Sequence, residues 1–461
     1  MILKTSLIEN LKLEFRPMAE LALPVVVAEV SWVLMGMVDT LMVGRIGALA
    51  IGAVSIGSSI VIFMGLLGMG ILFGLDYLVS KMFGAGNLED CHHSLIQGVY
   101  ISLFFGIFLT AITYSITYLL PISSIPPEVV TRAIGYMQPT SFSIVPLLLF
   151  TTARRYLQAR SIVKPITVLM FVANGVNTFA NWILIFGKLG APRMGATGAG
   201  YATLISMAFM ATGLVSYILY MERKQHSGLF HASFAFDTKR IREIIVLGVP
   251  VAIQMAFEVG AFTLATLLAG LLDANSLAAH HIVLKVASFT FMVPLGFANA
   301  GAVRIGQAIG RADAQGAIRS GRTALIFSAT FMSMAGLTFM ILPYAIMRSF
   351  TIDDTVIRIG ISLLAVAAFF QLFDGIQVTG AGTLRGLGDT RKAMFFNFLG
   401  HWIFGIPVGY ILCFYFEGGI WGLWIGLCIG LVVVALGMLY YWLRYEKKLA
   451  QGIVQREELL L

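Results

Sequence analysis

Apolar stretches of about 20 residues recur along the whole chain and alternate with short polar connections. An α-helix of about 20 residues spans the hydrocarbon core of a bilayer. The pattern therefore predicts an all-α integral membrane protein with twelve transmembrane helices. We place these spans at 18–43, 50–80, 94–118, 130–152, 166–187, 197–221, 244–270, 279–303, 322–343, 357–382, 393–415 and 418–444.

The connections are too short to hold a separate soluble domain. The longest, at about 222–243, is rich in basic residues and is predicted to join an N-terminal lobe (1–226, six spans) to a C-terminal lobe (227–461, six spans). Charges of both signs lead directly into the first apolar run, so we expect no cleavable signal peptide.

Composition agrees with the pattern. The 461 residues are 58% hydrophobic and 12% charged, which is too little charge to cover a water-soluble protein of this size. The net charge of +8 lies in the short connections, so it indicates membrane topology rather than a nucleic-acid partner. The three cysteines (Cys91, Cys413 and Cys428) have no metal-ligand spacing, and no cofactor is expected.

The positions of Lys and Arg predict the orientation. With the N-terminus in the cytoplasm, 24 of the 31 basic residues fall on the cytoplasmic side and Lys285 falls within a span. Cytoplasmic connections carry the excess of basic residues, so both termini are predicted to be cytoplasmic. The six basic residues on the outer side are Arg45, Arg132, Lys188, Arg193, Arg348 and Arg358.

The chain also repeats itself at an offset of 226 residues. That shift brings Pro24 onto Pro250, Gly44 onto Gly270 and Gly84 onto Gly310. Glycine and proline mark backbone geometry, so several matches at one offset indicate a duplication. Six spans per copy give both halves the same orientation, which predicts a pseudo-twofold axis along the membrane normal, a cavity between the halves and the rocking motion of a transporter.

Acidic residues inside spans are costly and are candidates for function. Glu258 in the seventh span follows Gln254 by one helical turn, and Asp374 in the tenth lies between Gln371 and Gln377. Such a group can bind Na⁺ through its oxygens, or bind a proton because a buried carboxyl group resists ionisation. Alternatively the acids form a structural ion pair with Lys285, the only basic residue that we place well inside a span.

The first half holds further candidates. Asp39 lies late in the first span, Glu29 nearer its middle, and Asp76 near the cytoplasmic end of the second span, where a structural role is favoured. Buried amides either join helices or contact a cation. Three asparagines share one face of the fifth span: Asn174, Asn177 and Asn181.

In the eighth span His280 and His281 lie one turn from Lys285, and a histidine there could change its charge near neutral pH.

Several motifs are absent. The sequence has no phosphate-binding Gly-x-x-x-x-Gly-Lys-Ser/Thr loop and no His-Glu-x-x-His, so neither ATP hydrolysis nor a membrane-embedded enzyme is supported.

Several segments resemble one known family, the multidrug and toxic compound extrusion (MATE) transporters, in its NorM-like branch. The resemblance covers nearly the whole chain. It rests on Met35-Gly-Met-Val-Asp39-Thr-Leu-Met-Val-Gly44, Lys164-Pro165, Asn177-Thr-Phe-Ala-Asn181-Trp182-Ile, Gly195-Ala-Thr-Gly198-Ala, Phe257-Glu258-Val, Ala278-Ala-His280, Asp374-Gly-Ile-Gln377-Val and Leu384-Arg385-Gly386.

The resemblance implies two six-helix lobes and export of small organic, often cationic drugs or dyes in exchange for H⁺ or Na⁺. It also implies that Glu258, Asp374 and Asp39 couple the cation, with possible Na⁺ at Glu258 and Asp374. The residues proposed to line or support the substrate cavity are Asn174, Asn177, Asn181, Gln254, His281, Lys285, Gln371, Gln377 and Glu29.

This chain departs from the NorM-like pattern in the eighth span, where it reads His280-His281 and then Lys285. A lysine facing Glu258 or Asp374 would take the place of a metal ion and favour proton coupling. A lipid-linked saccharide flippase shares the architecture but would line its cavity with several basic residues, and a static scaffold is a third alternative. We expect a monomer in a bacterial inner membrane, in contact with lipid and with no nucleic acid.

Overall fold

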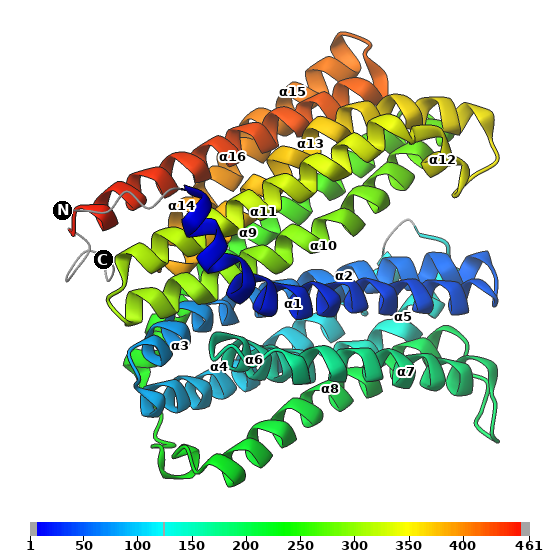
Figure 1. Ribbon diagram of the computed structural model, residues 1–461. Coiled ribbons are helices and arrows are strands. Elements are labelled where there is room, and N and C mark those ends of the chain that lie inside the picture. The colour runs from blue at the N-terminus through cyan, green and yellow to red at the C-terminus, as the bar shows by residue number, and fades with distance from the viewer. Residues whose placement is uncertain (1–6, 123–124, 453–461) are drawn as a thin grey trace. The chain divides into compact units, whose positions relative to one another are not determined.

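The computed structural model describes residues 7–122 and 125–452, and every regular element in these residues is a helix (Figure 1). The first ten elements are α1 (Leu7–Gly44), α2 (Ala48–Leu72), α3 (Gly74–Gly84), α4 (Leu88–Ile116), η1 (Leu120–Ile122), α5 (Pro127–Ser141), α6 (Ile144–Ala159), α7 (Lys164–Phe186), α8 (Ala196–Gln225) and η2 (Leu229–His231).

The remaining elements include two π-helical stretches, η3 and η4, within one span. In chain order, the remaining elements are α9 (Thr238–Gly270), α10 (Ala274–Gly310), α11 (Ala314–Ile341), α12 (Pro343–Arg348), α13 (Asp354–Gly386), α14 (Arg391–Asn397), η3 (Phe398–Gly405), α15 (Ile406–Tyr410), η4 (Ile411–Tyr415) and α16 (Gly419–Ala450).

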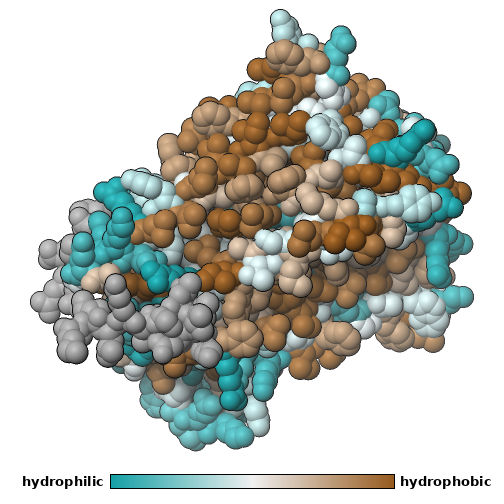
Figure 2. Space-filling view, turned by 45° about the horizontal axis from the view of Figure 1, so that its top comes forward, coloured by the Kyte–Doolittle hydropathy of each residue, from teal (hydrophilic) through white to brown (hydrophobic). Residues whose placement is uncertain are grey.

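Eleven helical segments of the described residues are long and apolar enough to cross a membrane, and the bent pair α5 and α6 makes a twelfth. The prediction of an all-helical membrane protein is therefore confirmed. Hydrophobic side chains cover most of the face shown in Figure 2, and hydrophilic ones gather towards its margins. That distribution is typical of a surface in contact with lipid.

The fourth span differs from the prediction. It is bent by 42° between α5 and α6, and α6 continues to Ala159, whereas the hydrophobic pattern placed the end at residue 152. Arg154 and Arg155 lie within α6 and are buried, with exposed fractions of 7% and 4%. The prediction that Lys285 is the only basic residue well inside a span missed them, because their charges ended the apolar window.

Helix boundaries recur at the offset of 226 residues. α1 ends at Gly44 and α9 at Gly270, while α3 ends at Gly84 and α10 at Gly310. The following helices, α4 and α11, start with the same device. The Asn87 side chain accepts a hydrogen bond from the Asp90 amide at 3.1 Å, and the Asp313 side chain accepts one from the Gly316 amide at 2.7 Å. Both are N-caps, which satisfy amides that the helix leaves unpaired.

The chain divides into two compact units. The first-half unit comprises Val27–Ala252, and the second-half unit comprises Ile253 onwards together with the residues up to Val26. Thus α1 and α9 each contribute one part to either unit. Within the second-half unit, the Glu14 carboxylate of α1 pairs with Arg304 of α10 and accepts a hydrogen bond from the Ser320 hydroxyl of α11 at 2.8 Å. The predicted lobe boundary at residue 226 stays a prediction.

Close backbone contact holds the first part of α9 in the first-half unit. A Cβ atom built on Gly248 would lie 1.8 Å from the Ile71 carbonyl oxygen of α2. A Cβ on Gly74 of α3 would lie 2.3 Å from the Ile244 carbonyl oxygen of α9. Only glycine permits approaches this close, and small residues at interfaces are how membrane helices pack.

Candidate functional site

Two acidic residues of the second-half unit lie beside the same cavity. Glu258 comes from α9 and Asp374 from α13, and both line a space of about 300 Å³. Phe262 and Thr266 of α9, Ser288 of α10 and Phe370 of α13 also line it. These residues are far apart in sequence, so helix packing and not local structure brings the carboxylates together.

The structure fixes the backbone beside Glu258. The Trp402 indole, in the π-helix η3, donates a hydrogen bond to the Phe257 carbonyl oxygen at 3.0 Å. The Trp402 ring also packs against the Phe257 ring, with centroids 6.3 Å apart. π-helical turns are frequent at functional sites because they displace side chains from the regular register. Here the displacement places Trp402 against the turn that presents Glu258.

Buried amides flank Asp374 on the same helix. Gln371 and Gln377 are fully buried, each with an exposed fraction of 0%. The Gln371 amide donates to the Thr290 hydroxyl of α10, but its oxygen has no hydrogen-bond partner. The Gln377 side chain faces the Glu258 carboxyl group and interacts with it. Buried polar atoms are almost always satisfied in folded proteins, so the Gln371 oxygen is a group that can still accept a hydrogen bond or contact a cation.

Gln254 lies one turn before Glu258 on α9 and is also buried, with an exposed fraction of 8%. The site therefore offers carboxylate and amide oxygens together. Oxygen ligands of this kind suit a hard cation such as Na⁺, and the same carboxylates can bind a proton. No group of three or more His, Cys, Asp or Glu side chains in the described ranges could hold a metal ion.

The structure does not bring a basic residue onto these acids. Lys285 and His281 lie on an exposed face of α10, and within residues 7–122 and 125–452 no ion pair joins Lys285 to Glu258 or Asp374. The structural ion pair considered from the sequence is thus not formed here. Two carboxylates beside one cavity repel each other when both are charged, and a bound cation or proton relieves that repulsion.

His280 is held by neutral partners. The Trp424 indole, which can only donate, gives a hydrogen bond to Nδ1 of His280 at 3.1 Å. The Nε2 atom lies 3.0 Å from the Thr266 hydroxyl. The indole therefore assigns the proton to Nε2, and this histidine packs as a neutral side chain.

The first-half unit holds a second acidic site. The Asn181 amide of α7 donates to an Asp39 carboxylate oxygen of α1 at 2.5 Å and to the Asn177 oxygen at 3.1 Å. Both asparagines are fully buried. Asn174, one turn earlier, donates to the Ser31 carbonyl oxygen at 3.0 Å and so joins α7 to α1. Among the described residues Asp39 has no ion pair.

Glu29 has a different environment, although it lies on the same helix as Asp39. Its carboxylate forms an ion pair with Arg154 of α6, and both side chains are buried. On α3, Asp76 pairs with Arg155 at 3.4 Å, and the Arg155 guanidinium lies 3.6 Å from the centre of the Phe73 ring. These contacts join α1 and α3 to α6 inside the first-half unit.

The comparison with known proteins identifies the family. The model of the MatE family matches residues 24–183 and 250–411, one match in each half of the chain. The chain belongs to the MATE family. This MATE protein is therefore a multi-pass membrane transporter and not an enzyme.

Curated relatives match over almost the full length of this transporter. A probable multidrug resistance protein NorM of Mesorhizobium japonicum is 32% identical over 95% of this chain and 96% of its own length. The multidrug resistance protein NorM of Vibrio cholerae is 32% identical over 94% of this chain and 97% of its own length. The assignment to the NorM-like branch rests on these relatives.

Solved structures share the fold. The eukaryotic MATE transporter AtDTX14 superposes with a TM-score of 0.86 at 20% identity, covering 96% of this chain and 100% of that chain. A MOP superfamily transporter from Pyrococcus furiosus superposes with a TM-score of 0.84 at 19% identity, covering 94% of this chain and 96% of its own.

Arg154 and Arg155 are buried charged residues of this transporter that the sequence prediction left out. Both were assigned to a cytoplasmic connection, although their adjacent pair of charges directly follows an apolar run. The signal that could have found them is Glu29. A carboxylate in the middle of a span needs a cationic partner or a function, and Arg154 was the first basic residue after the fourth apolar stretch.

Proposed function

We propose that this MATE transporter is a secondary active antiporter that exports small organic, often cationic compounds in exchange for H⁺ or Na⁺. The observation that carries the proposal is the pair Glu258 and Asp374, which line one cavity with buried amides and no basic partner. The names of the relatives, multidrug resistance proteins, support the class of substrate.

Coupling follows from the charge of that site. Binding a proton or Na⁺ at Glu258 and Asp374 removes the repulsion between the carboxylates, and this changes the relative stability of the inward-open and outward-open states. Drug and ion favour opposite states, so the release of one drives the transport of the other. Asp39 with Asn177 and Asn181 supplies a second place at which a cation can bind in the first half.

The wider arrangement belongs to the same proposal. The lobes predicted at 1–226 and 227–461 move against each other, and the polar side chains named in the sequence analysis line the substrate cavity. The transporter works as a monomer in a bacterial inner membrane, with both termini in the cytoplasm. The excess of basic residues in the connections assigned to that side supports this orientation.

The test uses purified protein in liposomes loaded with a fluorescent cationic dye. One set receives a pH gradient and the other a sodium gradient, and dye movement is followed. Movement that requires a gradient supports antiport, and the set that responds identifies the ion. If neither gradient moves dye while a fluorescent lipid-linked saccharide crosses the membrane, the flippase alternative replaces this proposal.

A further inference from the structure

A second cavity lies in the first-half unit, away from both acidic sites. It measures about 260 Å³ and is enclosed by α4, α6, α8 and the segment that follows α8. Its lining is apolar except for the Tyr100 hydroxyl, and this group donates a hydrogen bond to the Phe234 carbonyl oxygen at 2.6 Å. Pockets for drug-sized molecules measure roughly 300–1,000 Å³ and present several polar groups. This cavity is smaller, and the hydroxyl of Tyr100 is already hydrogen-bonded, so no polar group is left for a ligand. The cavity therefore suits a hydrocarbon chain.

The wall contributed by the segment after α8 is held by many hydrogen bonds. Glu222 at the end of α8 accepts hydrogen bonds from the Gly228 and Leu229 amides at 2.8 and 2.9 Å. The Ser227 carbonyl oxygen lies 3.0 Å from Nε2 of His92. Leu229 is thereby fixed at the cavity, where it is buried.

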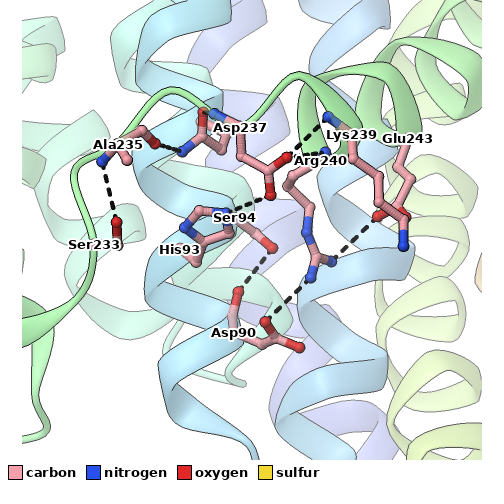
Figure 3. Close-up of polar contacts among 10 residues, drawn as sticks. Asp90, His93, Ser94, Ser233, Ala235, Asp237, Lys239, Arg240 and Glu243 are labelled. Carbon is pink, nitrogen blue, oxygen red and sulfur yellow. Dashed lines mark hydrogen bonds and ion pairs between the residues drawn. The ribbon is translucent and has the colours of Figure 1, made fainter.

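The next residues of this segment are fixed to α4 as well. The Gln97 amide donates to the Ala235 carbonyl oxygen at 2.8 Å, and its oxygen accepts from the Asp237 amide at 3.1 Å. His93 pairs with the Asp237 carboxylate at 3.0 Å, and Arg240 of α9 pairs with Asp90 at 3.2 Å (Figure 3). The cavity is therefore a built feature of the fold and not a gap beneath a loose loop.

Helix geometry gives the depth of the cavity in the membrane. α8 has 30 residues, and its cavity residues Val215 and Leu219 lie 10 and 6 residues before its last residue, Gln225. At 1.5 Å per residue the helix is about 45 Å long, and these residues lie about 9–15 Å from its end. A hydrocarbon core of about 30 Å leaves about 7 Å of the helix outside at each end. The cavity thus lies in the acyl-chain region of one leaflet.

Basic and aromatic side chains lie on the headgroup side of the cavity. Phe230, Phe234 and Phe236 are exposed, although such large rings favour a membrane interface over water. Four exposed basic residues lie on this side of the cavity, and none of them has an ion pair in the described part of the chain: Arg223 and Lys224 at the end of α8, and Lys239 and Arg242 at the start of α9. This set of four charges matches an anionic headgroup at the level where α8 leaves the hydrocarbon.

We propose that this cavity binds one acyl chain of an anionic membrane phospholipid, whose phosphate lies against the basic residues at the end of α8 and the start of α9. The bound lipid packs on Leu229 and Phe234 and keeps the connection between the two halves of the chain attached to α4. The proposal is independent of the transported substrate, and it gives the basic connection a ligand as well as a role in topology.

The test measures lipid binding to the full-length protein by native mass spectrometry and by thermal unfolding. Phosphatidylglycerol and phosphatidylcholine with identical acyl chains are titrated separately in detergent. The wild type is expected to retain one phosphatidylglycerol, and to unfold at a higher temperature with it than with phosphatidylcholine. Replacing both Arg223 and Lys224 with Gln is expected to weaken phosphatidylglycerol binding by about tenfold or more, because each basic residue near an anionic lipid contributes about fivefold.

A matched control changes Lys188 and Arg193 to Gln in the connection between α7 and α8, and lipid affinity should not change in it. A second variant, Ala153→Phe, fills the cavity and should abolish retention of both lipids in folded protein. The proposal is wrong if the two lipids bind equally and the Arg223/Lys224 variant matches the control. It is also wrong if folded Ala153→Phe retains lipid, or if a transported dye and not lipid occupies the cavity.

Discussion

Glu29 and Glu258 are both acidic residues within membrane spans, but their surroundings differ. In the first half, Glu29 is paired with Arg154, and Asp76 is paired with Arg155. In the second half, Glu258 and Asp374 lie beside one cavity and have amide neighbours in place of arginine. A carboxylate with a guanidinium partner is held within the protein and joins helices. A carboxylate without one remains available for an ion.

The cost of the two arrangements supports this distinction. Burying a charge in the membrane is expensive unless it is paired or neutralised. The pairs of Glu29 and Asp76 offset that cost within the protein. In the proposed function, a proton or cation offsets this cost at Glu258 and Asp374, and their state then depends on ion concentration. Asp39 accepts a hydrogen bond from the Asn181 amide and has no ion pair among the described residues, so it belongs with the second group.

The largest expected effect is the loss of ion-driven transport in Asp374→Asn. A neutral amide cannot exchange a proton and contributes no charge to cation binding. Efflux driven by the ion gradient should fall by about a hundredfold, which is within the range of coupling between two binding sites. Dye transport by reconstituted protein measures the effect. Binding of the dye at equilibrium should persist, and full gradient-driven efflux in Asp374→Asn would refute the assignment.

The next effect concerns stability. Arg154→Met removes the guanidinium that pairs with the buried Glu29 carboxylate, and breaking a buried pair in this way costs about 3–5 kcal/mol. Thermal unfolding in detergent should show a large loss for Arg154→Met. The double change Glu29→Gln and Arg154→Met should recover much of it, because no buried charge is then left. Equal losses in the single and double variants would show that the arginine acts through packing and not through the pair.

Asn181 tests the role of Asp39, the acidic residue that accepts a hydrogen bond from an amide and has no ion pair among the described residues. Asn181→Leu removes the amide that donates to Asp39, and a hydrogen bond to a charged group contributes about 1.5–3 kcal/mol. We expect a smaller loss of stability than in Arg154→Met, together with a changed dependence of transport on ion concentration. Asn174→Leu is the matched control, since it loses a contact to a backbone carbonyl and leaves Asp39 untouched. If transport depends on ion concentration in the same way in both variants, Asp39 takes no part in ion coupling.

The smallest effect belongs to a carboxylate outside the spans. Asp273 caps α10, and the Ser276 hydroxyl, which donates to it at 2.6 Å, lowers the pKa of Asp273 below its ordinary value. A lowered pKa in the folded state means that the ionised cap stabilises the fold above about pH 4, and that this contribution is lost as the pH falls through the folded pKa.

Asp273→Ala should therefore cost about 0.5–1 kcal/mol near neutral pH, and the difference from the wild type should shrink towards about pH 3. Thermal unfolding at both pH values measures this, with Asn275→Ala as the control at an exposed neighbouring position. A difference that stays constant with pH would mean that the side chain contributes through something other than its charge.

Most of the fold could be predicted from the sequence because membrane spans are long and nearly continuous in their hydrophobicity. The twelve predicted spans each correspond to a helical segment, and Gly44 and Gly270 end equivalent helices at the predicted offset. The prediction missed the bend between α5 and α6. Pro139 lies within α5, and Pro146 lies in the first turn of α6, where it has no amide hydrogen to donate to the carbonyl four residues earlier; the hydrophobic pattern alone did not show this break.

The acidic residues of the site could be named from the sequence, but their partners could not. Gln371 and Gln377 follow from helical spacing around Asp374. The ion pair of Glu29 with Arg154 joins residues 125 positions apart, and the contact of Gln97 with Ala235 joins residues 138 positions apart. Such distant contacts depend on how helices pack, and no local pattern in the chain encodes them.

The most direct test compares Glu258→Gln with the double variant Glu29→Gln and Arg154→Met in the same liposomes. Both remove a buried acidic charge, but only the first removes one that has no basic partner. Dye movement is followed under the gradient that drives the wild type. The expected result is that Glu258→Gln loses gradient-driven movement while the double variant keeps it. Retained movement in Glu258→Gln, with loss in the double variant, would contradict the assignment of the ion to the unpaired carboxylates.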